Sequence, residues 1–217
     1  MFDILLKHII HDAVTLFVII DPISLVPLFI ALTSREDPAQ RRKIALRATA
    51  LAAIVLISFI IVGQFLLDSI EISLSAFQIG GGLVLMIIGL KMVFDDDTEA
   101  EVLDREEGNP KKPILVSDVA VFPLATPLIA GPGAIMAVVL LTDNDKYSPL
   151  DQVTTAAVVL AILALTYLFL RQSDGVQNWL GRTGTSLVTR ILGLLVVAFA
   201  IQTMLVGISS FFGLVKT

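Results

Sequence analysis

Cysteine is absent from the 217-residue chain, which excludes disulfide bonds and thiolate metal sites. For the two histidines, His8 and His11, no third ligand is in view and an interfacial position is the preferred interpretation, so we predict no metal site. The sequence also lacks a G-x-x-x-x-G-K-[ST] motif, which argues against an ATP-driven pump. It shows no basic surface with interleaved aromatics that would suggest nucleic acid. We therefore expect a protein without a metal, a cofactor or a nucleic-acid partner.

Charged residues are scarce as well. They make up 16% of the chain, whereas hydrophobic residues make up 56%, and the mean hydropathy is +0.89. This composition predicts an integral membrane protein in contact with the lipid bilayer. Residues 1–20 do not resemble a cleavable signal, because Asp12 interrupts their apolar region. Continuous apolar runs of about twenty residues, enough to cross roughly 30 Å of hydrocarbon, predict six transmembrane helices at about 12–33, 46–67, 74–94, 114–141, 152–170 and 189–212.

The remaining charges are unevenly distributed. Segment 95–107 holds eight acids and one base, and we predict a solvated loop there. Lys and Arg concentrate on one side of the predicted helices, which by the positive-inside rule makes the loops after spans 1, 3 and 5 cytoplasmic and places both termini outside the inner membrane. Three basic residues, Lys7, Lys146 and Lys216, belong to the outer side. Those of the cytoplasmic side are Arg35, Arg41, Arg42, Lys43, Arg47, Lys91, Arg105, Lys111, Lys112, Arg171, Arg182 and Arg190.

Two stretches repeat the same proline spacing. A shift of 105 residues lays "FVIIDPISLVP" over "FPLATPLIAGP", so that both share P-x4-P inside a span. Further on, a shift of 111 lays Ser75, Gly82 and Gly89 over Ser186, Gly193 and Ala200, although a shift of 112 also gives matches. Spans 1–3 thus resemble spans 4–6. Because three is odd, the second copy enters the membrane from the opposite face, as in many secondary transporters.

This organisation predicts the fold class of an all-α membrane protein with two inverted three-helix repeats. We expect a single transmembrane domain over residues 1–217, with repeat 1 at about 1–94 and repeat 2 at about 114–217. The acidic cytoplasmic loop at about 95–113 joins them. The prolines restrict the residues before them and should break spans 1 and 4 near the middle of the membrane.

A broken helix leaves unpaired N–H groups at one end and unpaired C=O groups at the other. Together these groups could bind a zwitterion such as a small neutral amino acid, and glycines in "AGPGA" would let the backbone approach it. Asp21 followed by Pro22 also has the pattern of a helix N-cap, and the capping and binding roles are compatible. Asp21 is the best candidate for contact with a substrate ammonium or a coupling proton.

Other residues in the spans have two interpretations. Asp12 and Asp118 lie nearer the span ends; they are candidates for coupling, with an interfacial position as the alternative. Gly81, Gly82, Gly89 and Gly193 give spans 3 and 6 smooth faces for close helix contact near the site. An intramembrane aspartyl protease would need two adjacent carboxylates, such as Asp21 and Asp118. No G-x-G-D motif accompanies either acid, so we do not predict an enzyme.

Four motifs in order, "FVIIDPISLVPLFIALT", "AFQIGGGLVLMIIGLKM", "VFPLATPLIAGPGAI" and "RILGLLVVAFAIQTMLVG", resemble the MarC family, also called the small neutral amino acid transporter family. The resemblance covers nearly the whole chain. It implies six spans in two inverted repeats and, for the characterised archaeal branch, uptake of glycine and alanine coupled to protons. Other members are named for a supposed link to antibiotic resistance, so an exporter of another metabolite or a drug is the alternative.

Carried over onto this chain, the motifs imply a substrate site at Asp21, Pro22, Ile23, Ser24, Leu25, Val26, Thr126, Pro127, Leu128, Ile129, Ala130, Gly131 and Gly133. Two positions depart from the family pattern. Ser24 stands where the family often has glycine, and Gln78 stands where it often has arginine. A serine at position 24 could narrow the site or add a hydrogen bond.

Overall fold

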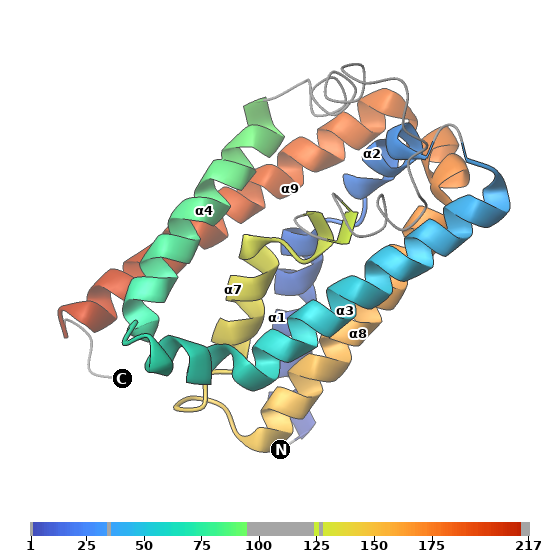
Figure 1. The fold of residues 1–217 in the computed structure, drawn as a ribbon. Coiled ribbons are helices and arrows are strands. Elements are labelled where there is room, and N and C mark those ends of the chain that lie inside the picture. The colour runs from blue at the N-terminus through green and yellow to red at the C-terminus, as the bar shows by residue number, and fades with distance from the viewer. Residues whose placement is uncertain (1, 34–35, 95–123, 126–127, 214–217) are drawn as a thin grey trace.

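The computed structural model describes residues 2–33, 36–94, 124–125 and 128–213, and its regular elements there are helices. In chain order they are α1 (Phe2–Ile20), α2 (Leu25–Leu32), α3 (Pro38–Ser69), α4 (Leu74–Phe94), α7 (Pro132–Leu141), α8 (Pro149–Arg171) and α9 (Ser173–Phe211) (Figure 1). Predicted span 1 corresponds to α1 and α2 with a break between them. Of predicted span 4, α7 forms the last part.

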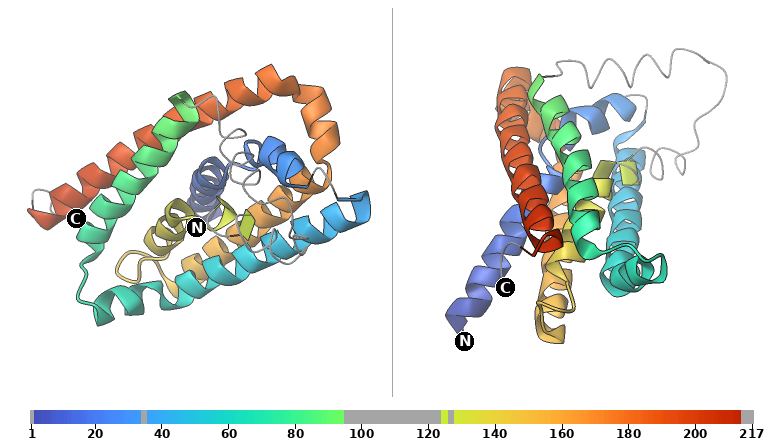
Figure 2. Two further views of the ribbon diagram at one scale, coloured as in Figure 1. Left: turned by 45° about the horizontal axis from the view of Figure 1, so that its top comes forward. Right: turned by 90° about the vertical axis from the view of Figure 1, so that its left-hand side faces the viewer.

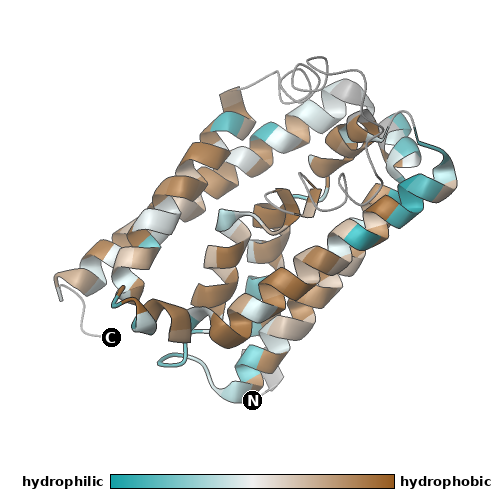
Figure 3. Cartoon of the chain, viewed as in Figure 1, coloured by the Kyte–Doolittle hydropathy of each residue, from teal (hydrophilic) through white to brown (hydrophobic). Residues whose placement is uncertain are grey.

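Within the described residues, four helical segments are long and apolar enough to cross a membrane: α3, α4, α8 and the part of α9 from Thr183 to Phe211. They overlap four of the six predicted spans. Outward-facing side chains on α3 are apolar, since Ile54, Ile61 and Phe65 are 64%, 74% and 72% exposed. A helix facing water would carry polar residues there. Figure 3 shows apolar residues along the helices and polar ones gathered towards their ends, so this all-helical fold suits a lipid environment.

Two predicted loops are wrong. Helix α3 already begins at Pro38, and α9 begins at Ser173, so much of segments 34–45 and 171–188 is helical. The physical reason is that hydropathy locates the lipid-facing length, whereas a helix continues into water when its end is capped. Asp37 supplies such a cap, because its carboxylate accepts the Gln40 N–H at 2.8 Å. Helix α9 is interrupted once, at Gly181, whose φ of 66° favours glycine.

The helices form two antiparallel pairs with shorter segments between them. Helices α4 and α9 lie side by side, α3 packs against α8, and α1, α2 and α7 lie between the pairs (Figures 1 and 2). A Cβ atom added at Gly89 would lie 2.9 Å from the Gly193 carbonyl oxygen, and one added at Gly193 would lie 3.0 Å from the Gly89 oxygen. One helical heptad away, a Cβ at Gly82 would lie 3.0 Å from the Ala200 oxygen. Small residues therefore allow the two backbones to touch.

Similar local structures occur at two pairs of helix ends. Thr33 follows α2 and Thr142 follows α7, and each hydroxyl donates at 2.6 Å to the carbonyl four residues earlier. After each threonine, the next helix starts with proline behind an N-cap whose side chain accepts a backbone N–H. For α3 the cap is Asp37, and for α8 it is Ser148, which forms a capping box with Asp151. The ends of α2 and α7 and the starts of α3 and α8 thus share one structural pattern.

Candidate functional site

The helix break after α1 is formed by Asp21. Its N–H still donates to the Phe17 carbonyl at 2.9 Å, so it closes the last turn of α1. Its φ is 47°, in the left-handed region that few residues other than glycine adopt, although aspartate tolerates it better than most. From there the chain turns over residues 22–24 before α2 begins at Leu25. The predicted break in span 1 is therefore present.

The Asp21 carboxylate is buried, with the residue only 4% exposed. Oδ1 accepts the Ser24 N–H at 3.2 Å. We expected Asp21 to be an N-cap with Pro22 as the first helical residue, but α2 starts three residues later, so Asp21 caps the intervening turn instead. Among the residues that the structure describes, no group hydrogen-bonds Oδ2. A buried carboxylate oxygen without a partner is costly, which makes it a strong acceptor for a ligand proton or ammonium.

Pro27 does not break the chain a second time. It is the third residue of α2, where a helix needs no N–H from proline. The expected departure of Val26 from helical structure is therefore wrong, since Val26 lies in the first turn of α2. In this segment the break therefore lies at Asp21.

Ser24 connects this break to the far end of the sequence. Its hydroxyl oxygen lies 2.6 Å from Oγ1 of Thr189 on α9, so the two hydroxyls share a hydrogen bond. The backbone N–H of the same residue binds Asp21. Ser24 thus joins the acid to α9 through one residue. Sequence reasoning missed Thr189, because a single threonine beside an apolar run carries no signal of its partner.

The second predicted break lies before α7. Gly131 is the N-cap of α7, with extended backbone at φ −76° and ψ 171° and no side chain capping the first turn. The first backbone N–H groups of α7 therefore have no side-chain acceptor from the cap residue. Gly133 faces a helix contact, because an added Cβ would meet side-chain atoms of Leu85 and Ile19. Thr126, Pro127 and Asp118 lie outside the described residues.

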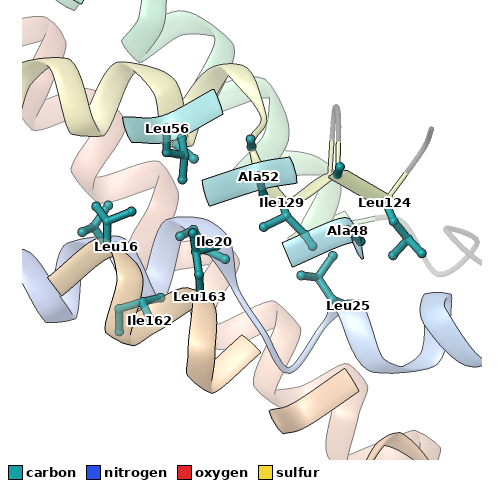
Figure 4. Close-up of a cluster of buried hydrophobic side chains, with 14 of the residues drawn as sticks. Leu16, Ile20, Leu25, Ala48, Ala52, Leu56, Leu124, Ile129, Ile162 and Leu163 are labelled. Atoms are coloured by element: carbon teal, nitrogen blue, oxygen red, sulfur yellow. The ribbon is translucent and has the colours of Figure 1, made fainter. Parts of the chain in front are cut away.

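Apolar residues of both segments share one cluster of buried side chains. Figure 4 shows Leu25 and Ile20 near Ile129 and Leu124, between the α3 side chains and those of α8. Ala130 belongs to the same cluster, Val26 is buried, and Ile23 and Leu128 are partly buried. Among the described residues of the predicted site, Asp21 and Ser24 are those that bring polar side chains. The arrangement is a small polar site with apolar walls.

The glycines predicted for packing lie at helix contacts. A Cβ atom at Gly81 would meet Met136 of α7, and those at Gly82, Gly89 and Gly193 would meet the facing helix of the α4–α9 pair. These glycines therefore serve the close packing of α4 with its neighbouring helices, and they add no polar side chain to the Asp21 break.

Asp12 is fully buried, at 0% exposure, on α1. Its Oδ2 accepts a hydrogen bond of 2.6 Å from the Thr155 hydroxyl of α8 and lies 3.3 Å from Nε2 of His8. This enclosure by protein is compatible with coupling and with an interfacial position, the two interpretations of this acid. Nothing in the local sequence identified Thr155 as its partner.

Comparison with known proteins identifies the family. Residues 6–212 match the family described as MarC family integral membrane proteins. A UPF0056 membrane protein of Archaeoglobus fulgidus is 36% identical over 90% of this chain and 89% of the relative. One of Methanocaldococcus jannaschii is 33% identical over 94% and 97%, and one of Escherichia coli is 31% identical over 91% and 90%. No solved structure matches the chain significantly. The chain therefore belongs to the MarC family of integral membrane proteins.

Proposed function

We propose that this protein is a secondary transporter of small neutral amino acids such as glycine and alanine, coupled to protons. The observation that carries the proposal is the buried Asp21 carboxylate at a helix break, with one oxygen free of partners among the described residues. An intramembrane acid in such a place is costly unless it binds something. A substrate ammonium or a proton would supply the missing partner, and the buried apolar residues around the break would suit a substrate with a small apolar side chain.

The proposed transport cycle rests on six spans in two inverted repeats, with the breaks of spans 1 and 4 forming one central site. Two features support this symmetry. Gly82 contacts Ala200, and Gly193 contacts Gly89. Position 193 lies 111 residues after position 82, and position 89 lies 111 residues before position 200, so exchanging the two repeats converts one contact into the other. Helices α3 and α8 also both begin with proline behind an N-cap residue whose side chain accepts a backbone N–H. Rocking of one repeat against the other would then expose the site to each face in turn.

The proposed location is the inner membrane, with both termini outside and the loops after spans 1, 3 and 5 cytoplasmic. The support is the excess of Lys and Arg beside those loops. In the structure, Arg41, Arg42 and Lys43 lie in the first turns of α3, beyond the most apolar part of that helix. This end of the bundle would thus face the cytoplasm.

Uptake of labelled glycine into proteoliposomes tests the proposal. We expect saturable uptake that alanine inhibits and that an inward proton gradient stimulates. If there is no saturable uptake and no competition by alanine, amino-acid transport is wrong. Export of another metabolite or a drug is then the alternative that the same architecture serves, and efflux assays would address it.

A further inference from the structure

Two polar clusters hold the first segment of the chain to the second at opposite ends of the bundle. The first, the Arg41 clasp, consists of Arg41, Thr33, Ser173 and Asp174. The second, the Asp12 clasp, consists of Asp12, His8 and Thr155. Each joins a residue of 1–94 to a residue beyond 124, so each crosses between the two proposed repeats.

The Arg41 clasp gathers three elements around one guanidinium. Nη1 of Arg41 donates to both carboxylate oxygens of Asp174 at 3.0 Å, and Nη2 donates to the Ser173 hydroxyl at 3.1 Å. Nε donates to the Thr33 hydroxyl at 3.1 Å, and the cation lies 5.7 Å from the centre of the Phe29 ring. An exposed ion pair alone would contribute little to the stability of this contact. Here the guanidinium also binds the buried Ser173 and Thr33, so it ties α2 and α3 to the start of α9.

The Asp12 clasp uses different chemistry at the other end. Thr155 donates to the buried Asp12 carboxylate at 2.6 Å, and the His8 ring lies against the Tyr147 ring with centroids 5.2 Å apart. It ties the first part of α1 to the first part of α8. Figure 1 shows the N-terminus near the start of α8, and α2 with the start of α3 at the opposite end.

The spacing of the two clasps matches a membrane. Thr155 and Ser173 are 18 residues apart along α8 and its end, which at 1.5 Å per residue is about 27 Å, close to the roughly 30 Å of hydrocarbon. Asp21 lies between them. It follows Asp12 by nine residues of α1, or about 13 Å, and the short α2, about 12 Å long, leads from its turn towards Thr33.

From this arrangement we infer that the Arg41 clasp and the Asp12 clasp are the two gates of the Asp21 site. Each gate closes the route to Asp21 from its own face of the membrane, and each opens when the two repeats separate at that end. The role of the gates in transport rests on the proposed function. Their opening is a property of the protein alone and can be measured without a substrate.

The absence of cysteine makes the test direct, because Ser24→Cys introduces a unique thiol beside Asp21. The measurement is the labelling rate of this thiol by a membrane-impermeant maleimide, in right-side-out and in inside-out vesicles. Arg41→Ala should raise the rate about tenfold from the face that carries Arg41, and Thr155→Val should do so from the opposite face. Asp174→Asn is a milder second variant of the Arg41 clasp.

Matched controls lie at neighbouring positions. Arg42 is exposed, Thr154 is half-buried, and both lie outside the two clasps, so Arg42→Ala and Thr154→Val should leave both rates unchanged. If the clasp variants raise labelling from both faces equally, or from neither, the two gates are overturned. Sided labelling without any amino-acid uptake would keep the gates and contradict the proposed function. Normal amino-acid uptake with unaltered labelling rates would support the proposed function and overturn the gates.

A disulfide bond across one clasp provides a second test in case one of the substitutions prevents folding. In Asp12→Cys with Thr155→Cys, the disulfide is formed before the maleimide reaches the Ser24→Cys thiol. Labelling from the Asp12 face should then fall to background. After reduction it should exceed the labelling of the same cysteine pair with Ser24 retained, because the two reduced clasp thiols react with maleimide as well. Undiminished labelling through the oxidised clasp would overturn the gate at that end.

Discussion

The hydroxyl oxygens of Ser24 and Thr189 lie 2.6 Å apart, although 165 residues separate them in sequence. This bond fastens the turn that carries Asp21 to α9. Ser24 supplies the side chain of this bond, which a glycine at the same position could not make. The bond bears on both the stability of the break and the space beside the acid.

Thr189→Val should lower the free energy of unfolding by about 1 kcal/mol, because the partly buried Ser24 hydroxyl loses its partner. Thermal or denaturant unfolding in detergent measures the change. Thr183→Val, at an exposed threonine of the same helix, is the control and should have little effect. A double-mutant cycle with Ser24→Gly should show coupling between positions 24 and 189. Additive effects would mean that the bond contributes nothing to stability.

The contact between α4 and α9 should tolerate no added methyl group at its crossing points. Gly193→Ala places a Cβ 2.8 Å from the Met92 Cβ and 3.0 Å from the Gly89 oxygen, so we expect a loss of about 1–3 kcal/mol in unfolding free energy. Gly80 is the matched control, since no atom lies within 4 Å of its added Cβ. Gly80→Ala should be neutral or stabilise the helix by up to about 1 kcal/mol. Equal effects at both positions would contradict the packing described.

Substrate binding should be visible as thermal stabilisation. A ligand that binds only the folded protein adds about 1.4 kcal/mol at ten times its dissociation constant. We expect glycine and alanine to raise the melting temperature of the purified protein, and tryptophan, which is outside the proposed class of small neutral substrates, to leave it unchanged. The increase should vanish in Asp21→Asn. Stabilisation by bulky amino acids as strongly as by glycine would contradict a small site.

Much of the architecture could be predicted from the sequence, because the length of an apolar run shows whether a helix can cross the lipid bilayer. Predicted span 74–94 coincides with α4, and the proline after Asp21 correctly indicated a break. Helix ends were harder to locate. Polar residues such as those of 38–45 can continue a helix in water, so their polarity alone does not mark a loop.

The partners of the buried polar groups could not be predicted. Asp12 meets Thr155 across 143 residues, and Ser24 meets Thr189 across 165. Such pairs depend on how α1 and the turn after it pack against α8 and α9, and local sequence carries no information on that packing. The left-handed conformation of Asp21 was also missed, because the sequence indicated a helix starting at Pro22, whereas a turn separates Asp21 from α2.

The most direct test of the account is glycine uptake by Asp21→Asn in proteoliposomes, with and without an imposed proton gradient. Asparagine tolerates left-handed backbone, and its amide oxygen can still accept the Ser24 N–H, so the turn should fold while the charge is lost. We predict a stable protein whose proton-stimulated uptake is abolished, beside a wild-type protein that concentrates glycine. Uptake by Asp21→Asn with the rate and pH dependence of the wild type would contradict the account and leave Asp21 as a residue of the turn alone.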